Sequence, residues 1–267
     1  MAYTDCPHLH RKSAPALKVR TCLESPHLLQ EPAPALRDKH LATPATAHTP
    51  LIDPTFLFRF EVPLREHDCT FGTTAAKPGL ELPESCRLTS FGALSGQRHF
   101  ADVRMAWDKT AIAFVVEVSG KQTLPWCRDS RLEDSDGFHL WIDSRCSPGI
   151  HRATQYCHRF LFMPTGGGPR RESPMTALMP INRARQNPKP PPAGSIQVHV
   201  RAQHDGYRMA GRIAASAMTG FDAVQYPRLG LYYAVIDREL GWQTFSLSQE
   251  YPVVEDPSLW GEAVLER

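Results

Sequence analysis

"DSDGFHLWIDSR", residues 134–145, contains the alternation that decides the fold. In it Phe138, Leu140 and Ile142 alternate with His139 and Trp141. Because successive side chains of a β-strand point to opposite faces, the pattern predicts a strand that buries its three apolar residues in a core. His139 and Trp141 then lie on the other face, which we expect to be a concave outer surface. A tryptophan on such a face needs a cover, which is either a ligand or another part of the chain.

The composition excludes several classes of partner. The 267 residues include 30 basic and 28 acidic ones, which give a net charge of +2. This balance supplies no field that would attract nucleic acid or an anionic membrane, so neither is an expected partner. No run of about 18 apolar residues occurs, so we expect no membrane-spanning segment. The N-terminal residues lack the apolar segment of a signal peptide, and a cytoplasmic location is therefore the default expectation.

The cysteines give no sign of a disulfide framework or of a zinc site. There are seven, an odd number without paired spacing, which favours reduced thiols. Cys146, His151, Cys157 and His158 lie close together in the sequence, but their spacings match no standard zinc site. Cys157 and His158 are adjacent in a predicted strand and would point to opposite faces. We predict no metal ligands among them.

The chain divides into two regions of different composition. Between Met1 and Pro54 there are eight prolines and five histidines, without apolar periodicity. Such a segment cannot bury enough apolar surface to offset its chain entropy, so we predict a disordered arm over residues 1–53. From residue 54 to 267 short runs of Val, Ile, Phe, Tyr and Trp alternate with Gly, Pro, Asp and Ser, which is typical of an all-β domain.

The second region predicts a sandwich of nine or ten strands. The expected strands are residues 55–62, 101–107, 111–118, 137–143, 156–163, 195–203, 206–214, 230–237 and 242–248. Turn signals at 107–110 and 204–206 predict antiparallel hairpins, and only 214–222 could form a helix. The fold expected is therefore an all-β, antiparallel, jelly-roll-like β-sandwich. Residues 164–194, rich in Gly and Pro, are expected to leave it as a long edge loop.

The sequence contains no recognisable catalytic motif. No Gly-x-Ser-x-Gly elbow occurs, and no cysteine lies at a strand-to-helix turn where its thiolate would be stabilised, so we do not expect an enzyme. The carboxylates of Glu133, Asp134 and Asp136 cluster in one turn, as either a solvated acidic loop or oxygen ligands for calcium. No other cofactor is expected.

The tryptophans are the better pointers to a ligand. In residues 242–248, Phe245 and Leu247 share the inward face, which leaves Trp242 pointing outward, as His139 and Trp141 do in their strand. Aromatic faces with nearby polar groups suit sugar rings, which stack on the aromatics while their hydroxyls need fixed hydrogen-bonding partners. A carbohydrate is therefore the expected ligand, and burial beneath the 164–194 loop is the alternative.

Five stretches resemble the family 9 carbohydrate-binding modules and their DOMON-type relatives. They are FADVRMAWDKTAIAFVVEVSG, PWCRDSRLEDSDGFHLWIDSR, DGYRMAGRIAASAM, RLGLYYAVIDRE and EDPSLWGEAVL, in the family's order over about residues 98–265. The resemblance implies a non-catalytic β-sandwich that binds a saccharide or glycoconjugate.

The resemblance also implies site residues. The family's stacking tryptophan before the acidic strand corresponds to Trp126, its strand carboxylate to His139 and its strand arginine to Arg159. Its amide falls at Ala234 and its second stacking tryptophan near Val254, so three of the family's sugar contacts are absent. We expect a changed ligand site that is lined by Trp126, His139, Trp141, Arg159 and Trp242.

Two other functions are open on the sequence alone. The same face could bind a protein, which predicts a flat apolar patch rather than a groove. A haem-binding DOMON-type domain is the other, because His139, His158 and Met105 offer axial ligand types.

Overall fold

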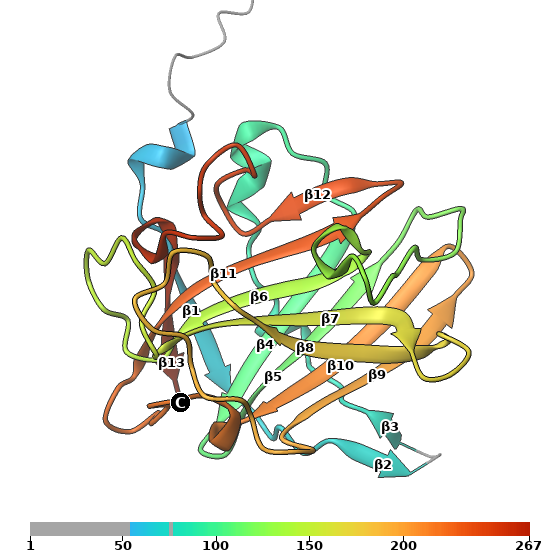
Figure 1. Cartoon of the computed structure of the whole chain (residues 1–267), viewed down its shortest axis with the longest axis horizontal. Coiled ribbons are helices and arrows are strands. Elements are labelled where there is room, and N and C mark those ends of the chain that lie inside the picture. Colours follow the sequence, from blue (N-terminus) through green and yellow to red (C-terminus); the bar gives the residue numbers. More distant parts are fainter. Residues whose placement is uncertain (1–53, 75–76) are drawn as a thin grey trace, which may run out of the picture. The chain divides into compact units, whose positions relative to one another are not determined.

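A computed structural model describes residues 54–74 and 77–267 of the chain (Figure 1). The arm predicted over residues 1–53 lies outside the described residues and stays a prediction. Within the described part there are thirteen strands, and every helix is a short 3-10 helix. The all-β prediction is confirmed.

The strands have the following bounds: β1 (Glu61–Glu66), β2 (Gly72–Thr74), β3 (Lys77–Gly79), β4 (Ala101–Asp108), β5 (Ala111–Val118), β6 (Gly137–Asp143), β7 (Cys157–Gly167), β8 (Ser173–Met179), β9 (Ile196–Gln203), β10 (Gly206–Ala214), β11 (Arg228–Asp237), β12 (Gly241–Thr244) and β13 (Gly261–Glu266). The 3-10 helices are η1 (Pro54–Leu57), η2 (Glu84–Cys86), η3 (Phe91–Ser95), η4 (Leu132–Asp134), η5 (Ala215–Ala217) and η6 (Pro257–Leu259).

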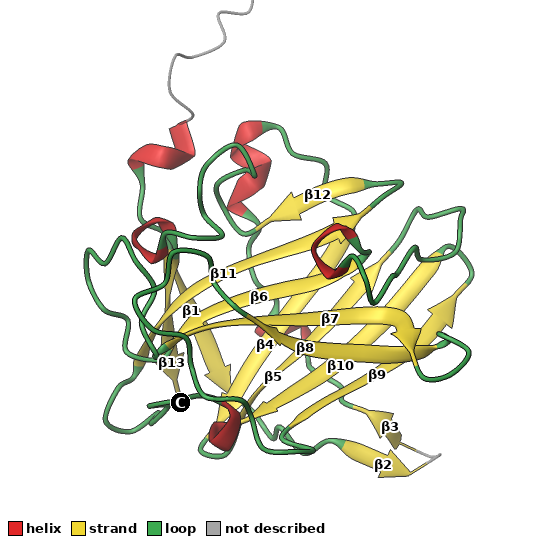
Figure 2. Ribbon diagram, in the orientation of Figure 1, coloured by secondary structure: helices red, strands yellow, loops and turns green. Residues whose placement is uncertain are grey.

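One sheet builds both layers of the sandwich. Its strands run in the order β8-β7-β6-β11-β13-β1-β4-β5-β10-β9, with β12 paired to β11. The sheet folds over, so that β8, β7, β6 and β11 form a front layer and β4, β5, β10 and β9 a back layer (Figure 2). Phe114 of the back layer packs on Phe138 and Phe162 of the front layer, with ring centroids 4.7 and 4.5 Å apart. The β-sandwich prediction is confirmed, and the core lies between these layers.

Strand β1 is the exception to the predicted antiparallel pairing. It lies parallel to both of its neighbours, β13 and β4. Trp107 of β4 fastens the three strands together, since its indole N–H donates to the carbonyls of Leu64 at 2.9 Å and Glu266 at 3.2 Å. In the sheet, β13 and β1 lie between β11 of the front layer and β4 of the back layer, so this parallel pairing joins the two layers.

The register of β6 is the one that its alternation predicts. Phe138, Leu140 and Ile142 are fully buried in the main core. Trp141 lies on the opposite face, where it pairs with Arg159 of β7 and with Tyr232 of β11. Side-chain periodicity alone therefore located the core face of the front layer.

Both predicted hairpins are present, because local turn chemistry fixes them. In the β4–β5 turn, the Asp108 carboxylate accepts hydrogen bonds from the backbone N–H and the hydroxyl of Thr110, both at 2.7 Å. In the β9–β10 turn, a Cβ on Gly206 would lie 1.9 Å from the carbonyl oxygen of Val118, so only glycine fits there. Such specific turns set the register of the strands that they join.

Several predicted boundaries differ from the structure. The run 55–62 is not one strand, because its first residues form η1 and β1 begins only at Glu61. Its large side chains Phe56, Leu57 and Phe58 are 46%, 70% and 62% exposed, so the apolar run does not enter the core. Residues 164–194, predicted as an edge loop, include the end of β7 and all of β8. The run 242–248 is strand only as far as Thr244, and the candidate helix 214–222 contains only η5.

The described cysteines Cys69, Cys86, Cys127, Cys146 and Cys157 are all free thiols, as predicted. In the described part of the chain, no helix has the length and apolar character needed to cross a membrane.

Candidate functional site

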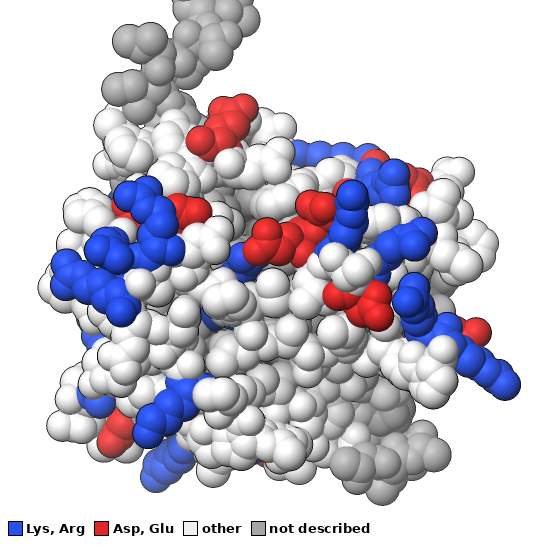
Figure 3. Space-filling view, viewed as in Figure 1, with Lys and Arg blue, Asp and Glu red and all other residues white. Residues whose placement is uncertain are grey.

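A cleft opens on the front layer, between the loop that precedes β6 and the β11–β12 hairpin. Its volume is about 510 Å³. It is lined by Trp126, Arg131, Glu133, Asp134, Ile236, Asp237, Arg238, Gly241, Trp242 and Gln249. Acidic and basic side chains gather over β11 and β12, whereas the surface over β8 is largely uncharged (Figure 3). Two of the predicted ligand residues, Trp126 and Trp242, thus line one cleft.

Trp126 is held in place through its backbone and its ring. Its N–H donates to the carboxylate of Asp136 at 2.9 Å, and its carbonyl accepts the N–H of Asp136 at 2.9 Å. The guanidinium groups of Arg238 and Arg128 lie 4.7 and 5.4 Å from the ring centroid. These are cation–π distances, so the half-buried indole is fixed in orientation although part of it remains accessible.

Trp242 comes to the cleft on β12. It pairs with Ile236 of β11, and the register places both residues on the face that carries Trp141, opposite the face of Phe138, Leu140 and Ile142. Its side chain is half-buried. Trp242 thus lies on the face that its alternation predicts, and its role as a ligand residue stays a prediction.

A buried ionic cluster fixes the walls of the cleft relative to one another. The Lys121 ammonium lies 3.0 Å from Asp136 and 2.9 Å from Asp237, and the side chains of all three are almost completely buried. Asp136 also accepts the backbone N–H of Arg238 at 2.8 Å. Burial alone would lower the pKa of Lys121, but its hydrogen bonds to Asp237 and Asp136 outweigh burial and raise it. These contacts tie the Trp126 loop to the β11–β12 hairpin.

Arg159 lies beneath the cleft rather than in it. Its side chain is only 8% exposed and pairs with Glu133 at 2.8 Å. Its guanidinium also covers Trp141, at 5.2 Å from the ring centroid. Arg159 therefore joins a carboxylate of the cleft wall to the sheet below.

The structure contradicts the solvent-facing position predicted for His139 and Trp141. Both lie on the predicted face of β6, but each is 0% exposed. Trp141 is covered by Arg159 and packs edge-on against Tyr232 at 5.4 Å. Both ring nitrogens of His139 lack a hydrogen-bond partner, and burial lowers its pKa to about 3. The alternation correctly predicted which face of β6 carries His139 and Trp141, but it could not show that other side chains cover that face.

The possible haem ligands do not converge. His139 pairs with Leu161, and His158 pairs with Ile142 of the core face, so the two imidazoles project from opposite faces of the front layer. The Nε2 atom of His158 is already the acceptor for the N–H of Thr219 at 2.9 Å. Met105 is buried in the core between the layers. These residues do not form a pair of axial ligands.

The acidic turn is not arranged as a calcium site. The Asp136 carboxylate is buried and bonded to Lys121 and two backbone N–H groups, whereas Glu133 and Asp134 are exposed. Across residues 54–74 and 77–267, no group of three His, Cys, Asp or Glu side chains could hold a metal ion.

Burial raises the pKa of Cys146 and of Cys157 to about 11, so these thiols are protonated rather than nucleophilic.

Sequence reasoning missed most of the cleft lining, including three side chains that could hydrogen-bond to a ligand. Arg131 lies in the loop, Arg238 at the end of β11, and Gln249 beyond β12. Nothing in their local sequence marks them, because the hydrogen bonds that bring the loop and hairpin together join residues about a hundred positions apart, such as Lys121 and Asp237.

The fold is that of the family 9 carbohydrate-binding modules. Two solved structures from Caldicellulosiruptor kristjanssonii show the similarity. A family 9 module in complex with cellotriose is 15% identical, with a TM-score of 0.51 over 78% of this chain and 94% of that one. A module in complex with glucose is 14% identical, with a TM-score of 0.52 over 78% and 97%. No protein-family model and no curated protein matches the sequence.

Proposed function

We propose that the chain is a non-catalytic binding module for a saccharide, which lies in the cleft between Trp126 and Trp242. One observation carries the proposal: two half-buried indoles from separate parts of the chain line the same cleft. Half-buried aromatic rings offer flat apolar faces on which the C–H face of a sugar ring stacks. The contacts of Trp126 with Arg128, Arg238 and Asp136 hold its indole in place before a ligand arrives, which reduces the entropy lost on binding.

The polar lining supplies the second requirement of a sugar site. Glu133 and Asp134 offer carboxylate acceptors, Arg131 and Arg238 offer donors, and Gln249 offers both. A volume of about 510 Å³ is in the range typical of small-molecule sites. Hydroxyl groups of one or two sugar rings would find partners on both walls.

The other predicted ligand residues have a supporting role in this proposal. Arg159 orients Glu133 through their 2.8 Å contact, and Trp141 supports the guanidinium of Arg159 from below. His139 fills the layer beneath the cleft. A ligand in the cleft would rest on this layer without touching His139 or Trp141.

The first ligands to test are suggested by the structural neighbours. The two similar modules were solved with cellotriose and with glucose. Titration calorimetry of the full chain with both sugars, followed by a glycan array, would identify the saccharide.

Replacement of either cleft tryptophan should remove most of the affinity. We expect Trp126→Ala and Trp242→Ala each to weaken binding by about tenfold or more, because each removes a stacking face. Leu124→Ala is the matched control, since Leu124 is a large apolar residue of the same loop that is 89% exposed and outside the cleft. Binding that survives both tryptophan substitutions, or a glycan array without any hit, would contradict the proposal.

A further inference from the structure

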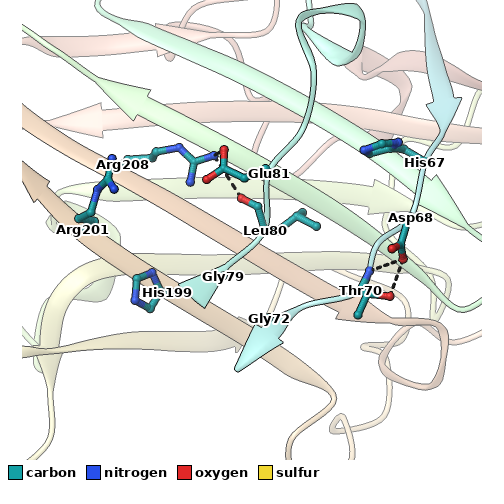
Figure 4. A pocket seen from close by; sticks show the side chains of 10 residues that line it. All are labelled: His67, Asp68, Thr70, Gly72, Gly79, Leu80, Glu81, His199, Arg201 and Arg208. Atoms are coloured by element: carbon teal, nitrogen blue, oxygen red, sulfur yellow. Dashed lines mark hydrogen bonds and ion pairs between the residues drawn. The ribbon is translucent and has the colours of Figure 1, made fainter. Parts of the chain in front are cut away.

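A second cavity lies on the back layer, beneath the segment that joins β1 to β4. Its volume is about 510 Å³. It is lined by His67, Asp68, Thr70, Gly72, Gly79, Leu80, Glu81, His199, Arg201 and Arg208. His199, Arg201 and Arg208 come from β9 and β10 on one side, and His67, Asp68 and Thr70 form the other side (Figure 4). It shares no residue with the saccharide cleft.

A row of charged residues crosses the back layer and ends at this cavity. The register places Asp102 opposite Glu117, Glu117 opposite Arg208, and Arg208 opposite Arg201. Across β4, β5, β10 and β9, two acidic residues are therefore followed by two basic ones. Like charges directly opposite each other on neighbouring strands are destabilising unless other charges compensate them.

Three of the four charges in the row are compensated. Asp102 pairs with Arg104 at 3.0 Å. Arg208 pairs with Glu117 at 2.8 Å and Glu81 at 2.5 Å, and it donates to the carbonyl of Leu80 at 3.1 Å. Its side chain is 11% exposed. The guanidinium of Arg208 is thus already paired with two carboxylates, and we do not expect it to bind the ligand directly.

Arg201 is the uncompensated charge. Among residues 54–74 and 77–267, none forms an ion pair or hydrogen bond with its guanidinium, which lines the cavity beside Arg208. The half-buried His199 lies two residues before it on the same face of β9. A Cβ on Gly79 would lie 3.3 Å from the Cβ of His199, so the covering segment closes directly over this imidazole.

We infer that this cavity binds a small oxyanion, the phosphate or sulfate group of a monoester. The guanidinium of Arg201 presents paired N–H donors that match two oxygens of such a group, and His199 can add a third donor. The anion would lie against the exposed guanidinium of Arg201, the one charge of the row without a partner among the described residues.

Titration calorimetry of the full chain at low ionic strength tests the inference. The probes are inorganic phosphate, inorganic sulfate, glucose 6-phosphate and glucose. We expect millimolar or tighter binding of the anions, and Arg201→Gln should weaken it by at least about tenfold. Measured in Trp126→Ala, so that the saccharide cleft does not contribute, a higher affinity for glucose 6-phosphate than for inorganic phosphate would identify the esterified anion as the ligand, and the reverse would identify the free anion. Either order supports an oxyanion site.

Two further variants show whether the anion binds in this cavity or elsewhere on the surface. Arg170→Gln removes an exposed arginine outside the cavity, and it should leave anion binding unchanged. Trp126→Ala should also leave anion binding unchanged, so failure of the saccharide proposal does not affect this one. The inference is overturned if the unmodified chain binds neither anion. It is also overturned if Arg201→Gln binds phosphate as well as the unmodified chain, or if Arg170→Gln loses as much affinity.

Discussion

Two buried histidines of the front layer, His139 and His158, differ in whether their rings make hydrogen bonds. His139 makes no hydrogen bond through either ring nitrogen, whereas Nε2 of His158 accepts the N–H of Thr219 at 2.9 Å. Burial lowers the pKa of His139 to about 3 and that of His158 to about 4. Both imidazoles are therefore neutral in the folded chain, and only one of them satisfies a backbone group.

Replacement of His139 should change the pH dependence of stability more than stability itself. The folded pKa of about 3 is below the usual value of 6.5, so the unfolded chain binds more protons between these two values. The stabilisation is fully present above the unfolded pKa and is lost as pH falls toward the folded pKa, by at most about 1.4 kcal/mol per pH unit. In His139→Leu this loss should be smaller, as measured by urea unfolding from neutral pH to pH 4.

His158→Leu provides the matched control. Its loss leaves the Thr219 amide without its acceptor, so the free energy of unfolding at neutral pH should fall by about 1–3 kcal/mol. His139→Leu removes two unpartnered nitrogens and should be neutral or stabilising at that pH. A loss of several kcal/mol in His139→Leu would show that the imidazole has a partner in solution.

Residue spacing could predict the faces of the site residues but not their exposure. Trp242 and Trp141 both point away from the core face, as their alternation indicates. Trp141 is nevertheless covered, because Arg159 and the loop before β6 lie over it. That cover depends on contacts between residues far apart in the sequence, which periodicity does not reveal.

At the scale of the elements, β6 is buried on both faces. Every residue of this strand is buried, including the polar ones. The core face packs on the back layer, and the other face supports the cleft through Trp141 and Arg159. A strand in this position resembles those of sheets covered on both sides, although its sequence alternates like that of a half-exposed strand.

Trp141→Ala should therefore act on stability. We expect a loss of about 3–5 kcal/mol in the free energy of unfolding, because a fully buried indole leaves a large cavity. Trp126→Ala, at a half-buried position, should cost far less in the same denaturant titration. A Trp141→Ala protein of unchanged stability would mean that the ring is accessible in solution and is again a candidate for ligand contact.

Sequence patterns identified the central strands well and the joining strands poorly. β4, β5, β6 and β10 begin and end within a residue of their predicted bounds, since each has a buried face and specific turns. The predicted strand over residues 55–62 begins before β1. The apolar run that contains Phe56 and Phe58 has a higher strand propensity than β1 itself, which contains a proline. β8 and β13 are short strands whose pairing comes from tertiary neighbours.

At the scale of the whole molecule, the described residues contain a complete core. Both layers and the joining strands lie between Glu61 and Glu266. We therefore expect a chain of residues 54–267 to fold and to keep a melting temperature close to that of the full chain. Scanning calorimetry of the two proteins checks this, and a fall of several degrees in the shorter protein would show that residues 1–53 stabilise the domain.

The parallel pair β1–β13 also determines when folding can finish. Paired residues such as Arg65 and Glu266 are 201 positions apart. A ribosome adding about 5–20 residues per second needs on the order of ten seconds to deliver β13 after β1 has emerged. Until then the nascent chain carries open edges on both β1 and β11, which are sites for wrong pairing and for chaperone capture. Native closure therefore waits until β13 has been synthesised, and slow translation between β1 and β13 prolongs the exposure of these edges.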